Sequence, residues 1–330
     1  MGSPESSREP DRESAPVSDA AASARPIHSA EELLPALSAP PEQVLRRASL
    51  GRRLVRVAIF AVVGGALGLG GYFGFKAFRH AQARRVPAKH FAADRATIGN
   101  AMWLEESPEF EVELGSYSLD VFEVTAAHYK TCVLDGACTR PARGAFCNFD
   151  EEDRDTHPIN CVSFDQAAAY CRWVGKRLPT EFEWEHAARA AADRPHEGPT
   201  ELYPWGVGPP DPRRANACGR ECSEFFTKRG ATQAALYDSD DGFPTTAPVG
   251  RFGDGATPDG LEDMAGNVWE WTASPFCHYP NTTCANDVEF VIRGGGFQSY
   301  QASTLEATSR EGLARSEATI TVGFRCAKDG

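Results

Sequence analysis

A run of 19 residues without a charged side chain, Val57–Phe75, divides this chain of 330 residues. Arginines precede the run, and Lys76 and Arg79 follow it. A helix of this length is long enough to cross a bilayer core of roughly 30 Å. The run therefore predicts a single transmembrane helix over 57–75, with a tail before it and a large domain after it.

Two other interpretations of the apolar run remain open. It could be a cleaved signal peptide with a cleavage site at Ala81–Ala83, although a long polar leader argues against this. It could also be a buried core helix, although its glycine content argues against that. Basic residues flank both ends of the run, so the positive-inside rule does not by itself settle the orientation of a membrane helix.

The composition on either side of the run differs. Residues 1–56 are rich in Ser, Pro, Ala, Glu and Arg, which predicts a disordered tail because little apolar surface is available to offset the entropy of ordering. Residues 76–100 form a predicted juxtamembrane linker, and residues 101–330 form the large domain. The net charge of −12 argues against a nucleic acid as partner, because phosphate binding needs clustered Lys and Arg.

All ten cysteines follow residue 131, and several lie close together in the sequence. An even number in close pairs indicates disulfides and an oxidising compartment. No Cys-x-x-Cys pair occurs, which argues against a zinc-thiolate site. If the domain carries disulfides, it lies outside the cytoplasm, periplasmic or extracellular, and the short tail lies inside.

Local signals predict several elements of the domain. Glu111–Phe122 alternates enough for two strands around Gly115 and Ser116. A helix should follow, begun by Thr125 and stopped at Gly136. Two capping boxes predict further helices; they are Ser163–Gln166, before Ala167–Val174, and Thr180–Glu183, before Trp184–Ala192.

Residues 195–280 are dominated by Gly, Pro, Asp and Asn with little periodicity, so something other than regular hydrogen-bonded ladders must fix their backbone. Carboxylates and amides within such backbone can supply oxygen ligands to calcium, although solvated turn residues are the plainer interpretation. Two candidate ligand sets occur: Asn216, Ala217, Asp241 and Phe243 (calcium set 1), and Asp263, Gly266, Val268 and Glu270 (calcium set 2), with the Ala, Phe, Gly and Val residues contributing main-chain oxygens.

Several phrases of the large domain together resemble the formylglycine-generating (sulfatase-modifying-factor) family. They include Asp120–Thr125, His157–Asn160, Ala169–Trp173, Gly175–Trp184, Tyr203–Gly206, Ala247–Gly250, Asp263–Trp271, Arg293–Gly296 and Gly323–Cys326. The resemblance implies an α+β, C-type-lectin-like fold with little regular secondary structure. It also implies structural calcium at both ligand sets, where Asp263 replaces the usual Asn.

The resemblance breaks at the catalytic cysteines. Active members hold copper(I) with two cysteines shortly after the Arg-Gly-Gly phrase, and here those positions are Ser299 and Thr304. Hydroxyls are hard, weak ligands that cannot replace thiolates for copper(I), so copper is not expected. Thr321 likewise stands where active members commonly have Asn.

The resemblance also bears on disulfide pairing. A family bridge matches Cys171 with Cys326, while a second family bridge has lost both partners, at Ala187 or Ala188 and at Ser309. We therefore predict local bridges for the remaining cysteines, although the spacing alone permits other connectivities. The predicted local pairs are Cys132–Cys138, Cys147–Cys161, Cys218–Cys222 and Cys277–Cys284.

Other conspicuous residues have plain structural interpretations. Trp269 and Trp271 are predicted to pack in the core rather than to bind substrate. Arg177 and Arg325 are predicted to pair with internal carboxylates or carbonyls. For the two histidines His128 and His157, surface or capping roles are predicted, because neither has a second His or Cys at ligand spacing.

The sequence and the family resemblance are compatible with three alternative functions. The first is a membrane-anchored, extracytoplasmic binding or assembly module, stabilised by calcium and without oxidase activity, for a protein or peptide ligand. The second is a formylglycine-generating oxidase with copper ligands from elsewhere, such as Cys277 and Cys284. The third is calcium-dependent carbohydrate binding, by analogy of fold alone. The predicted binding cleft consists of Phe297, Ser299, Tyr300, Thr304, Arg310 and Thr321.

Overall fold

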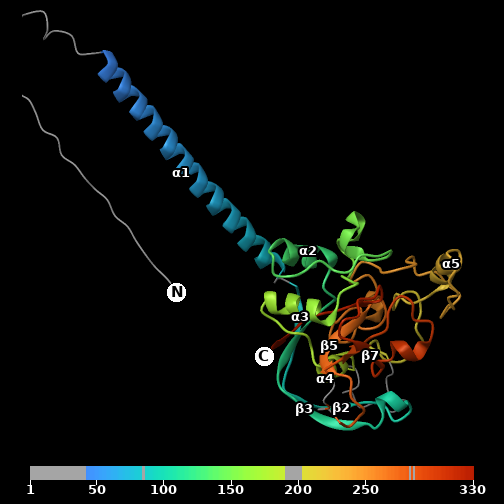
Figure 1. The fold of residues 1–330 in the computed structure, drawn as a ribbon. Coiled ribbons are helices and arrows are strands. Elements are labelled where there is room, and N and C mark those ends of the chain that lie inside the picture. The colour runs from blue at the N-terminus through green and yellow to red at the C-terminus, as the bar shows by residue number, and fades with distance from the viewer. Residues whose placement is uncertain (1–41, 84–85, 190–202, 282–283, 285–286) are drawn as a thin grey trace, which may run out of the picture. The chain divides into compact units, whose positions relative to one another are not determined.

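The computed structural model describes residues 42–83, 86–189, 203–281, 284 and 287–330. The chain divides into two units, Met1–Gly68 and Leu69–Gly330. Helix α1 spans Glu42–Ala83 (Figure 1). Part of the predicted tail, 1–41, lies outside the described residues, whereas residues 42–56 and 76–83 are helical, which corrects the predicted boundaries of tail and linker.

Helix α1 is longer than the apolar run because its polar ends are also good helix formers. Pro40 and Pro41 precede Glu42, and Glu42–Arg56 is rich in Arg and Leu, which extend a helix at little cost. Within the second unit, the last turns of α1 contact the domain. Lys76 Nζ donates to the carbonyl of Asp135 at 2.9 Å, and a ring nitrogen of His80 lies 2.8 Å from the carbonyl of Trp173.

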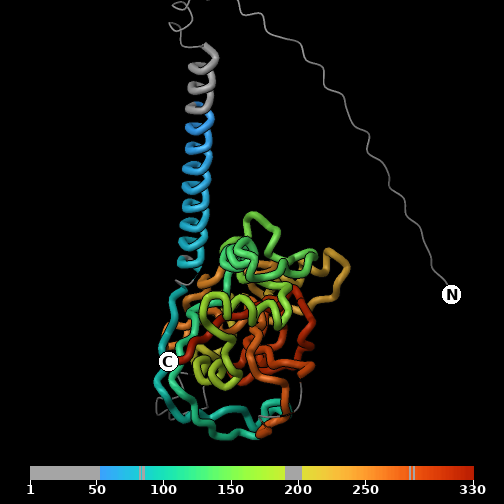
Figure 2. The backbone as a smooth tube through the Cα atoms, turned by 60° about the vertical axis from the view of Figure 1, so that its left-hand side comes forward, coloured from blue at the N-terminus to red at the C-terminus, as the bar shows by residue number. Residues whose placement is uncertain are grey.

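The strands in the described part of the domain form three small sheets. The first has the order β1 (Ala88–Phe91), β4 (Tyr117–Asp120) and β9 (Ala327–Asp329), so the C-terminal strand lies in the same sheet as the first strand after α1 (Figure 2). The second pairs β2 (Asp94–Ile98) with β3 (Phe110–Leu114). The third has the order β7 (Arg310–Ala314), β6 (Glu289–Arg293), β5 (Trp269–Pro275) and β8 (Val322–Gly323), with β8 parallel to β5.

The two strands predicted within Glu111–Phe122 are present as β3 and β4, but they do not pair with each other. β3 pairs with β2, and β4 lies between β1 and β9. Gly115 and Ser116 therefore carry the chain from one sheet to another. The sequence pattern reports alternation along a strand but not which partner completes its ladder.

Helices α2 (Ala126–Leu134), α3 (Phe164–Trp173) and α4 (Glu181–Ala188) begin where the sequence predicts. The Thr125 hydroxyl accepts from the NH of His128, and both capping boxes form in full. Gly136, at the predicted stop, has φ +75°. Helix α5 (Arg220–Thr227) lies in the segment expected to be irregular, and no signal in the sequence analysis predicted it.

The remaining regular structure consists of short 3₁₀ turns, namely η1 (Leu104–Glu106), η2 (Asn148–Asp150), η3 (Glu152–Arg154), η4 (Gly253–Gly255) and η5 (Ala302–Leu305). Apart from α5 and η4, the described residues between 203 and 268 carry no helix or strand. The α+β class and the scarcity of regular structure are thus confirmed. The lectin-like part of the expectation stays a prediction.

The core combines aromatic side chains with buried charge. Trp184 and Trp271 are fully buried, as are the side chains of Arg293 and Arg325. The largest apolar cluster joins α2 and α3 to β5, β6 and the C-terminal segment through Tyr129, Tyr170, Phe324 and their neighbours. All ten cysteines are paired, in the pairing that the sequence analysis predicts: 132–138, 147–161, 171–326, 218–222 and 277–284.

Candidate functional site

A cavity of about 230 Å³ opens where the turn after β6 meets the start of β5 and the strand β7. Hydroxyl, amide and aromatic side chains line it, together with one carboxylate. The lining residues are Trp269, Gly296, Gln298, Ser299, Tyr300, Gln301, Thr304, Glu311 and Thr321. We call this cavity the cleft.

The cleft contains both positions at which the sequence analysis noted hydroxyls in place of cysteines. The Ser299 hydroxyl accepts a hydrogen bond from the NH of Gly296 at 3.1 Å, and the Thr304 hydroxyl donates to the carbonyl of Gln301 at 2.8 Å. Both hydroxyls therefore take part in the local turns that shape the cleft. Neither can act as a soft ligand for copper(I).

Two of the six residues predicted for the cleft do not line it. Phe297 is fully buried and stacks on Phe226. Arg310 is 3% exposed, because its guanidinium bonds to Glu181 and to the carbonyl of Cys277. The alternation of side chains along a strand explains the second correction, since Arg310 points inward and its neighbour Glu311 points toward the cleft.

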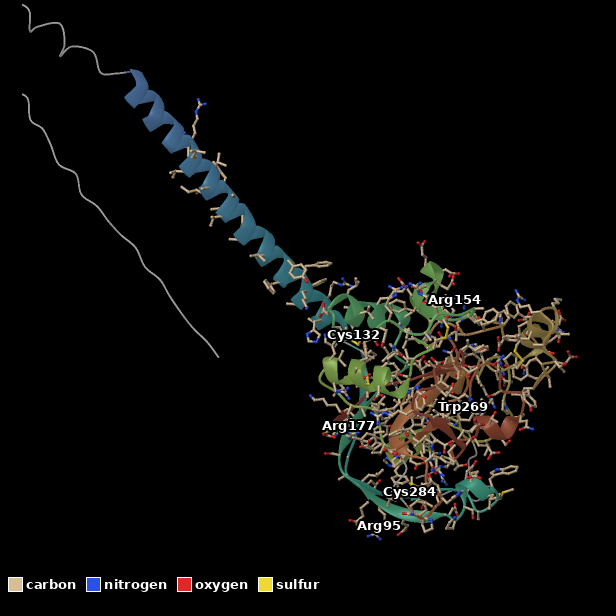
Figure 3. All side chains as sticks on the ribbon, viewed as in Figure 1. Arg95, Cys132, Arg154, Arg177, Trp269 and Cys284 are labelled. Atoms are coloured by element: carbon tan, nitrogen blue, oxygen red, sulfur yellow. A yellow bond between two sulfur atoms is a disulfide. The ribbon has the colours of Figure 1, made fainter. Side chains whose placement is uncertain are left out.

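The sequence analysis missed five residues of the cleft: Trp269, Gly296, Gln298, Gln301 and Glu311. Trp269, labelled in Figure 3, is 8% exposed and belongs to the core, as predicted, while one side of it also faces the cleft. The parallel pairing of β5 with β8 brings it there, because this pairing sets Trp269 directly opposite Val322, next to Thr321, and no local sequence signal reports such a pairing.

Glu311 supplies the carboxylate among the residues that line the cleft. Burial against the cavity wall raises the pKa of this carboxyl above its usual value, although the residue remains exposed to solvent. Among the described residues, no ion pair involves Glu311. The cleft therefore offers one carboxylate among neutral hydrogen-bonding groups and two aromatic rings.

The oxidase alternative required free thiols at Cys277 and Cys284. These two cysteines form a disulfide with each other. Since every cysteine of the chain is bridged, the folded, oxidised domain has no thiol for copper or for a substrate cysteine. This is the main chemical fact about the site.

Calcium set 1 brings together a buried amide and a partly buried carboxylate. Asn216 is fully buried and its Nδ2 donates to the carbonyl of Thr245 at 3.0 Å, but its Oδ1 has no hydrogen-bond partner. Asp241 accepts from the NH of Phe243 at 2.9 Å and from the hydroxyl of Tyr237 at 3.1 Å. Burial raises the pKa of Asp241 to about 7.

These observations match what a hard cation requires. An unpartnered oxygen on a fully buried amide is costly unless something outside the described chain satisfies it. Oxygen ligands from an amide, a carboxylate and adjacent carbonyls suit calcium in flexible geometry. The first set fits a calcium ion on this ground.

Calcium set 2 fits a dication poorly, because its strongest carboxylate already has a cationic partner. Both oxygens of Glu270 bond to the guanidinium of Arg325 at 2.8–2.9 Å, and one also accepts from Trp184 Nε1 at 2.8 Å. Asp263 accepts from the NH of Gly250 at 2.5 Å. The unpaired oxygen in this region belongs to Glu123, which is fully buried and which the sequence analysis did not select.

Within the described parts of the chain, no group of three or more His, Cys, Asp or Glu side chains is arranged to hold a metal ion. A transition-metal centre built on such side chains therefore has no counterpart in these segments. A calcium site relying on carbonyl and amide oxygens is a different kind of site, and the fit of the first set depends on those oxygens.

The residues given structural roles have partners that suit those roles. The guanidinium of Arg177 bonds to both oxygens of Glu183 at 2.6–2.7 Å. Arg325 also donates to main-chain carbonyls, including that of Asp263. His157 is 6% exposed and its Nδ1 lies 3.1 Å from the hydroxyl of Thr246, so it is a core residue rather than a surface one.

Residues 76–330 match the "Sulfatase-modifying factor enzyme 1-like domain". A formylglycine-generating enzyme of Mycobacterium tuberculosis is 35% identical over 216 residues, which cover 59% of this chain and 64% of the relative. The inactive C-alpha-formylglycine-generating enzyme 2 of Bos taurus is 36% identical over 177 residues, covering 52% of this chain and 50% of the relative.

Among solved structures, PvdO from Pseudomonas aeruginosa aligns with a TM-score of 0.56 at 21% identity, covering 74% of this chain and 94% of that one. This likeness supports the fold alone. The chain spans less than two thirds of the length of the mycobacterial and bovine relatives that it matches. The match over residues 76–330 establishes that the chain belongs to the sulfatase-modifying factor enzyme 1-like (formylglycine-generating) domain family.

Proposed function

We propose that this protein is a membrane-anchored, extracytoplasmic binding module that uses the cleft to hold a protein or peptide ligand without oxidising it. The observation that carries the proposal is the chemistry of the cleft: Ser299 and Thr304 occupy it, and all ten cysteines are bridged. Oxidation of a substrate cysteine by this family's route needs thiolate ligands for copper(I).

The proposed anchor is helix α1. Residues Arg53–Ala81 are long and apolar enough to cross a membrane, with a mean hydropathy of 1.9 in their most apolar window. A signal sequence would pass the same test, so the anchor is part of the proposal. Five disulfides are typical of an oxidising space and support a location of the domain outside the cytoplasm.

The proposal includes a structural calcium ion at calcium set 1. Asn216 and Asp241 would hold it with side-chain oxygens, and main-chain oxygens of Ala217 and Phe243 would complete the set. Calcium there would fix the irregular segment that precedes β5. A chelator should therefore lower the thermal stability of the full-length protein in detergent, and added calcium should restore it.

The test of the cleft proposal is direct. The full-length protein, purified in detergent, is incubated with copper, oxygen and a sulfatase-type Cys-x-Pro-x-Arg peptide, and the peptide is analysed by mass spectrometry. We expect the peptide mass to be unchanged. Formation of the aldehyde would show that the second candidate function, formylglycine generation, is the right one.

A matched variant tests the chemical reason. The double substitution Ser299→Cys with Thr304→Cys places two thiols in the same cleft, and we expect it to bind copper(I) in a competition with a chromogenic chelator. The wild-type protein should not compete. Equal copper(I) binding by both proteins would mean that the ligands lie elsewhere, and the argument from the cleft would fail.

A further inference from the structure

Helix α5 carries a carboxylate that the described chain leaves without a partner. Both oxygens of Glu221, in the first turn of α5, are buried and accept no hydrogen bond. The neighbouring Arg220 approaches Asp238 instead, at 3.8 Å. Burying an ionised carboxylate without a counter-charge is costly, so a protein keeps one in such a place when something else compensates it.

Glu221 lies beside calcium set 1. A Cβ atom added to Gly219 would come within 2.8 Å of both Glu221 Oε2 and the ring of Tyr237, which places these two groups next to each other. The hydroxyl of Tyr237 in turn donates to Asp241 at 3.1 Å.

Asn216 supplies an independent observation on the same site. Its side chain is fully buried, its Nδ2 has partners, and its Oδ1 has none. The same hydroxyl of Tyr237 also lies 3.1 Å from the carbonyl oxygen of Ala215, the residue before Asn216, so the amide and the two carboxylates belong to one region of the fold. The side-chain oxygens of Asn216, Glu221 and Asp241 therefore have no positively charged partner among the described residues.

Two alternatives to a bound cation could compensate the charge of Glu221, and each is weaker. The backbone NH groups of Glu221 and Cys222 at the start of α5 do not reach hydrogen-bonding geometry with the Glu221 oxygens. A proton shared between Glu221 and Asp241 would remove one charge, yet it would leave the Asn216 oxygen unsatisfied. A cation satisfies the carboxylates and the amide together.

We propose that Glu221 is a ligand of the calcium ion at calcium set 1, alongside Asp241 and Asn216, and that the Cys218–Cys222 disulfide fixes Glu221 in place. This inference rests on the calcium part of the proposed function. The site contains oxygen ligands only, with two carboxylates whose charge matches that of one divalent cation, and such a site is typical of calcium.

The disulfide gives the site its rigidity. Cys222 follows Glu221 directly and is fully buried, so the bridge holds the first turn of α5 against the core. The NH of Cys218 donates to the carbonyl of Ser299 at 2.9 Å, which joins the bridge to the wall of the cleft. Loss of the bridge should free Glu221 and weaken calcium binding.

The experiment uses the full-length protein in detergent, stripped of metal with a chelator and titrated with calcium chloride by calorimetry. We expect Glu221→Gln to weaken calcium binding at this site by about tenfold or more, because ligand charge sets calcium affinity. Glu224→Gln on the same helix is the matched control. Glu224 is exposed and pairs with Lys228, so its loss should leave calcium affinity unchanged.

Thermal unfolding separates a ligand from a structural residue. In calcium-free protein, Glu221→Gln should keep or raise the melting temperature, because it removes a buried charge, while calcium should raise the melting temperature less than in wild type. The double variant Cys218→Ala with Cys222→Ala should also weaken calcium binding. When Glu221→Gln is added to this double variant, it should weaken calcium binding less than the same substitution does in the protein with the disulfide intact.

Three outcomes would overturn the inference. If Glu221→Gln binds calcium as tightly as wild type, Glu221 is not a ligand, and the calcium part of the proposed function survives. If the variant is equally less stable with and without calcium at unchanged affinity, its role is structural. If wild type binds no calcium, the inference and the calcium part fail together, whereas the cleft proposal is tested separately by the peptide assay.

Discussion

Arg293 shows at the scale of a single residue how this fold places charge in its core. The side chain is fully buried, and Nη2 bonds to Glu181 at 3.0 Å and to Glu185 at 2.9 Å. Nη1 donates to the carbonyl of Thr308 at 2.8 Å. Glu181 is shared with Arg310, so the network ties α4 to β6 and β7.

Replacing Arg293 with Met should therefore be strongly destabilising. Removal of one partner leaves buried carboxylates with less compensation, which costs about 3–5 kcal/mol in comparable buried pairs. Denaturant unfolding of the full-length protein measures the loss. Lys228→Met is the control, because its exposed pair with Glu224 should contribute no more than about 0.5 kcal/mol. Similar losses in the two variants would contradict this account of the core.

His157 makes a pH-dependent prediction at the same scale. Burial, aided by the nearby charge of Arg154, lowers the pKa of His157 to about 4, whereas an unfolded histidine titrates near about 6.5. Because the folded pKa is depressed, the neutral ring stabilises the fold above pH ~6.5, and this contribution is lost as the pH falls toward ~4.

The substitution His157→Gln should remove this contribution. Between pH 7.5 and 5.5 the wild-type free energy of unfolding should fall by about 1 kcal/mol more than that of the variant, since the unfolded histidine takes up a proton that the folded one does not. Urea unfolding at the two pH values provides the measurement. A variant with the same pH dependence as wild type would show that another group is responsible.

At the scale of elements, the five disulfides differ in how much chain each constrains. Cys171–Cys326 joins α3 to the C-terminal segment across a sequence separation of 155, whereas Cys132–Cys138 spans only 6. A bridge that closes a longer loop removes more entropy from the unfolded chain, by about 5 kcal/mol for the first and about 2 kcal/mol for the second in the chain-entropy description.

Paired alanine variants test this difference. Cys171→Ala with Cys326→Ala should destabilise the protein more than Cys132→Ala with Cys138→Ala, because each change removes one bridge without leaving an unpaired thiol. Calorimetric melting temperatures of both double variants, compared with wild type, give the order. An inverted order would mean that native-state packing around the bridges outweighs loop entropy.

Some elements of the fold could be predicted from local sequence patterns, and others could not. Thr180 and Glu183 are three residues apart, and their reciprocal bonds form within one turn, so a local pattern was enough to place α4. The partner of β3 could not be predicted in this way, because β2 lies in a segment that carried no signal of its own. Helix α5 begins at Gly219 without a side-chain cap, in a segment dominated by turn residues, so its start had no signature.

The residues of the cleft also fall into two groups, those that the sequence predicted and those that it did not. Ser299, Tyr300, Thr304 and Thr321 were found because they lie near motif residues in the sequence. Glu311 and Trp269 were not, because the cleft is assembled by strand pairing across long separations. Arg310 was misplaced by one residue, the smallest possible error on a strand, and that error moved the prediction from the cleft to the core.

For the molecule as a whole, helix α1 determines whether the protein stays in a membrane and on which side the domain lies. If α1 is an anchor, alkaline extraction should leave the protein in the membrane fraction, and protease added outside intact cells should digest the domain while an N-terminal epitope stays protected. Disulfide formation requires the domain to lie on the oxidising side, so this orientation should dominate.

Replacing Leu67 and Leu69 with Arg, in the middle of the apolar run, should abolish membrane retention, whereas Leu104→Arg in the exposed turn η1 should not. Release of wild-type protein by alkaline extraction, with a new N-terminus near residue 84, would instead identify the helix as a cleaved signal sequence.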